Sequence, residues 1–99
     1  MKEADTVRKI IGWLKNHDFW AVKMHGGPFM VMGIPDVLAI KDGRAFWFEV
    51  KTPRGVPTKV QLYVMKQLRK HGCVAEVVRS VSDVVRVMEQ RLDQHSTSD

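Results

Sequence analysis

The sequence predicts an α/β fold, a three-layer α/β/α sandwich with a mixed four-stranded sheet and the order helix, three strands, helix, strand, helix. Apolar residues recur at helical spacing in three segments, and β-rich runs lie between them. The dipeptide Asp42-Gly43 joins two of these runs, which is typical of a β-hairpin. A helix then separates the second run from a last strand, and such a crossover makes those two strands parallel.

The first predicted helix covers residues 2–16. Its inward stripe repeats at i, i+3, i+4 and i+7 and consists of Val7, Ile10, Ile11 and Leu14. Glu3 lies four residues before this stripe, where an acid either complements the helix dipole or faces a site. A strand at 19–25 follows, and Gly26-Gly27-Pro28 interrupts it.

The apolar run Phe29–Met32 lies between that interruption and Gly33. It fits a short strand extension, a substrate-facing loop or a dimer contact. The residue pattern alone does not separate these three alternatives.

The hairpin strands are predicted at 36–41 and 45–51, with Asp42-Gly43 as the loop. Gly adopts the positive φ of a type I′ turn freely, and Asp tolerates it. This turn makes Lys41 face Arg44, and each outward step then pairs residues whose numbers keep the same sum.

The same count places Asp36 directly opposite Glu49 at the open end of the hairpin. Directly opposite side chains share a face, with Cβ atoms about 4.5–5.5 Å apart. Strand alternation puts Lys51 on that face as well. The register therefore predicts a cluster of two carboxylates and a lysine, although each residue alone also fits turn chemistry or a solvated strand end.

Residues 52–57 are predicted to be a loop, because neither Pro nor Gly suits a central strand. A helix over about 58–71 follows, in which Thr58 and Gln61 fit a capping box and Gly72 supplies the stop. Its predicted inner face comprises Val60, Val64 and Leu68, with Leu62 and Met65 adjoining.

A strand at 73–78 and a last helix capped by Ser82 complete a single domain over residues 1–92. The polar residues 93–99 are expected to form a frayed tail. No repeat and no long linker divides the chain.

The chain is basic, with 16 Lys and Arg against 11 Asp and Glu and a net charge of +5 over 99 residues. This charge favours an anionic partner, nucleic acid before a membrane surface, beside the plain alternative of a soluble basic protein. Cys73 is the only cysteine and no apolar run reaches the length of a membrane span, so we expect a cytoplasmic protein without disulfides. The candidate DNA-binding residues are Lys23 and the cations of the most basic helix, Lys59, Lys66, Arg69 and Lys70.

Asp36 and Glu49 would offer hard oxygen ligands, which suit Mg²⁺ or Mn²⁺ bound with several waters. Two carboxylates this close repel each other unless a cation or a shared proton lies between them. A metal there would polarise a phosphoryl oxygen and lower the pKa of a water, and Lys51 would orient that water or stabilise charge around phosphorus. These parts predict metal-dependent hydrolysis of a phosphodiester.

The sequence also resembles a known family at these positions. Pro35-Asp36 followed by Glu49-Val50-Lys51 matches the PD-(D/E)xK signature of the restriction-endonuclease-like superfamily. With the Gly33-Ile34 prefix, the Thr52-Pro53 suffix and Gln61, the pattern resembles a stand-alone VRR-NUC domain, the virus-type replication-repair nuclease. Such domains are similar to archaeal Holliday-junction resolvases, and the resemblance covers nearly the whole chain.

The resemblance implies roles for these residues. Asp36 and Glu49 would bind the metal together with the backbone carbonyl of Val50, and Lys51 would be the catalytic lysine. Glu3 would complete the acidic cluster from the first helix, while Gln61 would support the site from the basic helix. The implied protein is a bacterial or phage-encoded homodimer, a divalent-metal-dependent DNA endonuclease that is Holliday-junction-resolvase-like and selective for branched DNA.

Two alternatives stay open at the level of sequence. The chain could be a basic DNA-binding module whose acidic cluster is catalytically silent, or a nuclease directed at RNA. Metal-dependent nicking of plasmid DNA separates the first alternative from an endonuclease.

Overall fold

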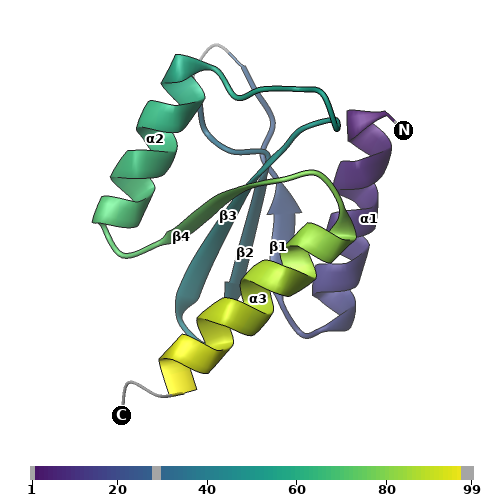
Figure 1. Ribbon diagram of the computed structural model, residues 1–99, viewed down its shortest axis with the longest axis vertical. Coiled ribbons are helices and arrows are strands. Elements are labelled where there is room, and N and C mark those ends of the chain that lie inside the picture. Colours follow the sequence, from purple (N-terminus) through teal and green to yellow (C-terminus); the bar gives the residue numbers. More distant parts are fainter. Residues whose placement is uncertain (1, 28–29, 97–99) are drawn as a thin grey trace.

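The computed structural model describes residues 2–27 and 30–96, and its elements follow the predicted order (Figure 1). The helices are α1 (Glu3–Asn16), α2 (Lys59–Lys70) and α3 (Val81–Ser96). The strands are β1 (Trp20–Lys23), β2 (Val37–Lys41), β3 (Arg44–Val50) and β4 (Val74–Val78). No helix within the two described ranges is long and apolar enough to cross a membrane.

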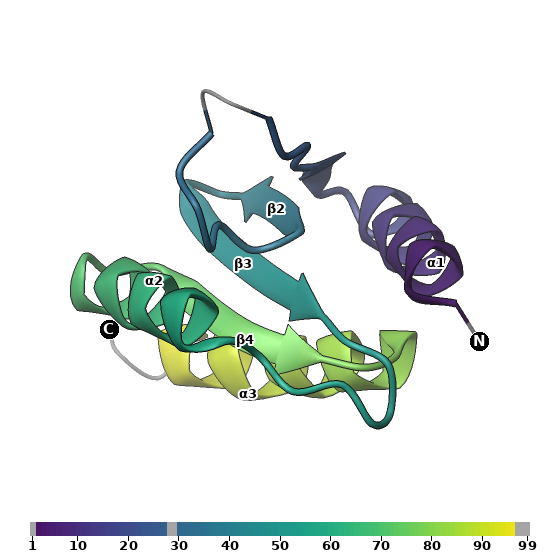
Figure 2. The same cartoon turned by 90° about the horizontal axis from the view of Figure 1, so that it is seen from above.

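The strands form one sheet in the spatial order β1-β2-β3-β4. β1, β2 and β3 are antiparallel neighbours, whereas β3 and β4 are parallel because α2 connects them. α1 and α3 cover one face of the sheet and α2 covers the other, so β4 lies between α2 and α3 (Figure 2). The predicted three-layer α/β/α sandwich with a mixed four-stranded sheet is confirmed.

The main core lies between the sheet and the two helices α1 and α3. From the predicted stripe of α1, Val7, Ile10 and Leu14 are buried in it. The strands contribute alternate residues, as their pleat requires, among them Val37, Ala39, Phe46, Phe48 and Val50. Because its neighbours on β3 face this core, Glu49 faces the opposite side of the sheet, towards α2.

The hairpin has the predicted register. Lys41 pairs with Arg44, and every further pair of the ladder keeps the predicted sum. Asp42 and Gly43 have φ values of 51° and 76°, the positive values that a type I′ turn requires.

The strand ends differ from their predicted positions by one or two residues. β1 covers 20–23 instead of 19–25, and β4 begins at residue 74 instead of 73. β3 spans 44–50 instead of 45–51, so Lys51 follows the strand. β2 begins one residue after Asp36, so this aspartate precedes the ladder instead of belonging to it.

Helix α2 begins as predicted but packs differently. The Thr58 hydroxyl accepts a hydrogen bond from the Gln61 backbone N–H, and the Gln61 side chain accepts one from the Thr58 N–H. The prediction that Val60 lies on the inner face is wrong, because Val60 is 44% exposed and Met65 is buried. The inward positions recur at i, i+3, i+4 and i+7 and are Gln61, Val64, Met65 and Leu68.

Helix α3 is capped by Ser80, not by the predicted Ser82. The Ser80 hydroxyl accepts a hydrogen bond from the Asp83 N–H at 3.2 Å, and the Asp83 carboxylate accepts one from the Arg79 N–H at 2.8 Å. The helix continues to Ser96, so residues 93–96 of the predicted tail are helical. The last part of that tail, 97–99, lies outside the described residues.

The segment before Gly33 is a bend and turn over residues 30–32, not an extension of β1. Val31 and Met32 are 66% and 79% exposed, and Phe29 lies outside the described residues. Gly33 has a φ of +87°, and a Cβ atom there would lie 2.7 Å from Val60 Cγ1. The chain therefore passes in close contact with the start of α2 just before it reaches Asp36.

Candidate active site

Asp36 is held at the open end of the hairpin by hydrogen bonds from two directions. Its backbone carbonyl accepts a hydrogen bond from the Met24 N–H at 2.7 Å. Its Oδ2 accepts one from the Val50 N–H at 2.8 Å. The second bond ties the side chain to the last residue of β3, directly beside Glu49.

Glu49 is only 2% exposed, although it carries a carboxylate. Its Oε2 lies 3.4 Å from Lys51 Nζ and accepts a hydrogen bond from Gln61 Nε2 at 3.2 Å. Its Oε1 is buried and accepts no hydrogen bond from any donor in the part of the chain that the structure describes. A carboxylate oxygen left in this condition is costly unless a proton or a cation supplies the missing interaction.

The protonation of Glu49 reflects this environment. Burial raises the pKa of Glu49, the nearby Asp36 carboxylate raises it further, and the Lys51 ammonium partly opposes both. The result is a pKa of about 7 instead of 4.5. The Glu49 carboxyl therefore changes between its protonated and ionised forms near neutral pH.

Gln61 serves the helix and the site with different atoms. Its backbone N–H and its side-chain oxygen complete the capping box with Thr58, while its Nε2 donates to Glu49. Because position 61 lies on the inward face of α2, the cap itself aims the amide at β3. The sequence prediction that capping and site support coincide at Gln61 agrees with this geometry.

The donor set fits a hard divalent cation. Two carboxylates from neighbouring segments, one with a free buried oxygen, suit Mg²⁺ or Mn²⁺ that keeps several waters. Asp36 and Glu49 would be the side-chain ligands. The third predicted ligand, the carbonyl oxygen of Val50, stays a prediction.

The structure does not bring Glu3 into this group. Glu3 is the first residue of α1 and is exposed. Among the side chains that the structure describes, in residues 2–27 and 30–91, no three His, Cys, Asp or Glu gather closely enough to hold a metal. The expectation that Glu3 completes the acidic cluster is therefore not met by direct contact.

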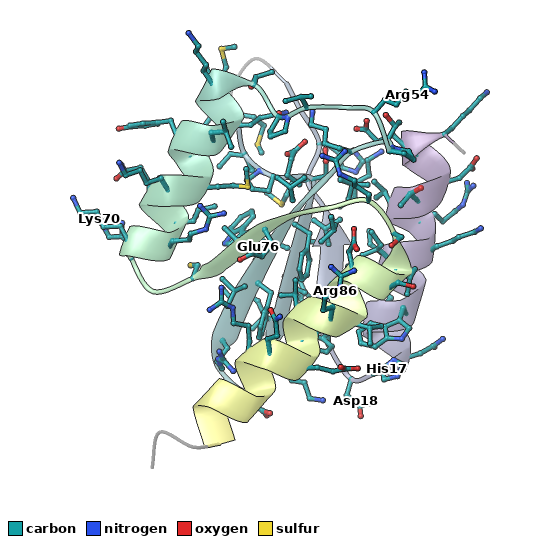
Figure 3. The ribbon with its side chains drawn as sticks, viewed as in Figure 1. His17, Asp18, Arg54, Lys70, Glu76 and Arg86 are labelled. Carbon is teal, nitrogen blue, oxygen red and sulfur yellow. The ribbon has the colours of Figure 1, made fainter. Side chains whose placement is uncertain are left out.

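Arg79, which no sequence pattern marks, holds the loop after Lys51 in place. Its Nη1 donates to the carbonyl oxygens of Thr52 at 2.6 Å and Gly55 at 2.7 Å. The N–H of Lys51 donates to the Val78 carbonyl at 3.0 Å. The loop after Lys51, which Arg54 marks in Figure 3, is thus tied to the end of β4. These bonds fix the direction in which the backbone continues from β3 through Lys51.

The candidate DNA-binding cations do not form one surface. Lys59, Lys66 and Lys70 are exposed on α2, and Arg69 shares this helix. Lys23 instead lines a hollow with residues of α1, on the other side of the sheet. The basic helix, not the end of β1, is the cationic surface that continues from Gln61.

Comparison with solved structures identifies the fold. One structure described as a VRR_NUC domain protein has a TM-score of 0.76 and 20% identity, covering 91% of this chain and 87% of that one. A second, described as a VRR_NUC domain, has a TM-score of 0.74 and 24% identity, covering 88% and 94%. No protein-family model and no curated protein matches the sequence. The chain has the fold of VRR_NUC domains over about nine tenths of its length.

Proposed function

We propose that this chain is a divalent-metal-dependent DNA endonuclease of the VRR-NUC kind, acting on branched DNA in the manner of a junction resolvase. The observation that carries the proposal is the buried Glu49 carboxylate, whose Oε1 has no partner although Asp36 and Lys51 lie beside it. A carboxylate retained for packing alone would be paired on both oxygens or replaced by an amide, because burying an unsatisfied charge is costly.

Asp36 and Glu49 would hold Mg²⁺ or Mn²⁺, with the Val50 carbonyl as a further ligand. The bound cation would supply Lewis acidity towards a phosphoryl oxygen and acidify the attacking water. The Val50 N–H bond fixes the rotamer of Asp36, and the bonds from Lys51 and Gln61 fix that of Glu49. The carboxylates are therefore preorganised before the cation arrives.

Lys51 has the position to act on the substrate. Its ammonium is 3.4 Å from Glu49 and its side chain keeps 14% of its surface exposed, so it is oriented from within and accessible from outside. It would stabilise negative charge around phosphorus or orient the attacking water. Glu3 would act from the rim, through water or DNA, since it makes no direct contact with the carboxylate pair.

The partner that suits this site is a polyanion. The net charge of +5 and the cationic face of α2 favour nucleic acid. A homodimer would present two such sites to the two strands of a junction, and the exposed Val31, Met32 and Val60 supply apolar surface near the site for contact between copies.

Plasmid nicking with Mg²⁺, Mn²⁺ or EDTA tests the proposal. The wild-type protein should nick only with metal, and Lys51→Ala should slow nicking by about 10²–10³-fold. Glu49→Gln should abolish nicking and leave DNA binding in EDTA intact. Arg86→Gln is the charge-matched control, because Arg86 is exposed on α3 and its ion pair is with Asp83 of the same helix.

A wild-type protein that binds DNA but never nicks it with either metal would contradict the proposal and establish the catalytically silent DNA-binding module. A panel of four-way junctions, flaps, duplexes, single strands and RNA then determines the substrate. Light scattering tests the dimer, and a monomer at micromolar concentration would count against a junction resolvase.

A further inference from the structure

A second cationic feature lies at the end of the strands opposite to the carboxylate pair. There β3 and β4 begin and α2 and α3 end. A surface hollow of about 330 Å³ is lined by Arg44 of β3, Arg69 of α2 and Arg91 of α3, together with Cys73. We call it the arginine hollow, and its volume far exceeds the roughly 15 Å³ that a single water requires.

Each arginine of the hollow is oriented by a hydrogen bond to the fold. Arg69 Nε donates to the Ala75 carbonyl at 2.8 Å, and Arg44 Nη1 donates to the Arg91 carbonyl at 3.3 Å. Arg91 Nη2 donates to the Glu76 carboxylate at 3.1 Å. A guanidinium carries five N–H donors, so the single bonds of Arg44 and Arg69 hold these two groups in place and leave donors for a ligand.

The charge of the hollow is incompletely compensated. Glu76 balances Arg91, whereas Arg44 and Arg69 form no ion pair with any carboxylate whose side chain the structure describes. The ends of α2 and α3 contribute only partial negative charge, about half a unit each. Several guanidinium groups that line one hollow suit a phosphate, which accepts paired N–H donors.

We propose that the arginine hollow binds a backbone phosphate of the DNA substrate, away from the bond that is cut. This inference rests on the proposed function for the identity of the partner, and it concerns residues that take no part in the chemistry. Figure 3 shows the placement: Lys70 at the end of α2 and Glu76 on β4 lie away from Arg54, which marks the loop after Lys51.

The spacing of the two sites gives the proposal a length. Arg44 and Glu49 are five residues apart on β3, so the hollow lies about 17 Å from the carboxylate pair. Helix α2 runs between the two and carries exposed lysines along its length. At 3.4 Å per base pair, the anchored phosphate would lie about five base pairs from the cut.

Cys73 makes a direct test possible, because it is the only cysteine of the chain, it is partly exposed and it lines the hollow. Alkylation by neutral N-ethylmaleimide is timed in EDTA with and without DNA. If DNA at 100 times its Kd fills the hollow, the alkylation rate should fall by about 100-fold. An unchanged rate at DNA saturation, established by fluorescence anisotropy, overturns the proposal.

Inorganic phosphate is the second arm of this experiment. Protection by phosphate and by DNA is the result expected for a phosphate site on the DNA path. Protection by phosphate without protection by DNA assigns the hollow to a small free anion and overturns the proposal.

The salt dependence of DNA binding tests the same contact by affinity. Loss of one phosphate contact should make the slope of log K against log salt less negative by about 0.9. We expect this change in the double variant Arg44→Gln/Arg69→Gln. Cys73→Asp places a negative charge in the hollow while keeping every arginine bond, and it should weaken binding when Cys73→Ser does not. Arg86→Gln should leave the slope at its wild-type value.

A lower melting temperature of the double variant with an unchanged slope, and an inert Cys73→Asp, would assign the arginines to packing alone. Plasmid nicking is scored separately with each variant. A wild-type protein that nicks without using the hollow refutes this inference and leaves the proposed function standing. A protein that binds DNA through the hollow and never nicks refutes the proposed function and leaves this inference standing.

Discussion

Glu49→Gln should stabilise the metal-free protein while it removes the activity. The pKa of Glu49 is raised by burial first and by the Asp36 carboxylate second, with Lys51 opposing, from 4.5 to about 7. A change of that size costs the ionised form roughly 3 kcal/mol relative to an exposed carboxylate. Glutamine has the same shape and can accept hydrogen bonds from Lys51 and Gln61, so it relieves the charge without opening a cavity.

The sign follows from proton binding. A carboxyl whose pKa is higher in the folded state keeps its proton more tightly there, so ionisation disfavours the fold. The penalty is absent well below pH 4.5, grows as the pH rises towards 7, and is constant at higher pH. Substitution should therefore matter little at pH 5 and most at pH 8.

Urea and thermal unfolding in EDTA at pH 5 and pH 8 measure this difference. At pH 8 we expect Glu49→Gln to gain roughly 2–3 kcal/mol, and each kcal/mol raises the Tm of a domain this small by about 4–8 °C. Glu76→Gln is the matched control, because Glu76 is a partly exposed glutamate of the same sheet paired with Arg91. Its loss should cost about 0–1 kcal/mol.

Adding Mg²⁺ should stabilise the wild-type protein and leave Glu49→Gln unchanged, because the cation replaces the missing partner of Oε1 only when Glu49 is a carboxylate. A Glu49→Gln protein that is less stable than wild type at pH 8 in EDTA would refute this reasoning. So would a stability difference of the same size at both pH values.

Gly33, Arg79 and Glu49 allow three further tests. Gly33→Ala should lower the free energy of unfolding in urea by about 2–3 kcal/mol, because its Cβ would lie 2.7 Å from Val60 at the start of α2. Gly72→Ala is the control, and it should cost about 1 kcal/mol because Gly72 has a φ of +93° but open space around it. Equal costs would exclude the clash. Arg79→Gln should lower kcat by roughly 10-fold or more with KM little changed, because the substitution frees the loop after Lys51 without removing a group that contacts the substrate. A change confined to KM would contradict this positioning role. The Mg²⁺ affinity, measured by calorimetry, should increase with pH by up to about tenfold per pH unit below pH 7 and level off above it, because Glu49 must lose its proton to bind the cation. An affinity that does not change with pH would show that Glu49 is not a ligand.

The parts of the site that depend on neighbouring residues were predictable from the sequence. The Asp42-Gly43 turn set the hairpin register, and the register brought Asp36 beside Glu49. The capping box was visible as Thr58 and Gln61, three residues apart. Each of these relations is local, because a turn or a helix end determines it whatever the rest of the chain does.

The features that the sequence did not reveal depended on how whole elements dock. Val60 and Met65 are both apolar and near the same helix stripe, and only the position of α2 on the sheet decides that Met65 is the buried one. The role of Glu3 stays a prediction, because the docking of α1 decides how near its exposed carboxylate comes to the pair, and the described side chains form no metal-binding group of three. Arg79 carries no periodic signal, because its two carbonyl partners lie 27 and 24 residues earlier in the chain.

The sequence by itself determined the fold class, the hairpin register and the proximity of Asp36 to Glu49, because periodicity and turn chemistry act over a few residues. Only the tertiary structure decided the state of Glu49: its burial, its pKa of about 7 and the oxygen without a partner. Those properties arise where β3, α2 and the segment before β2 meet. A carboxylate gains or loses water only when all three have packed.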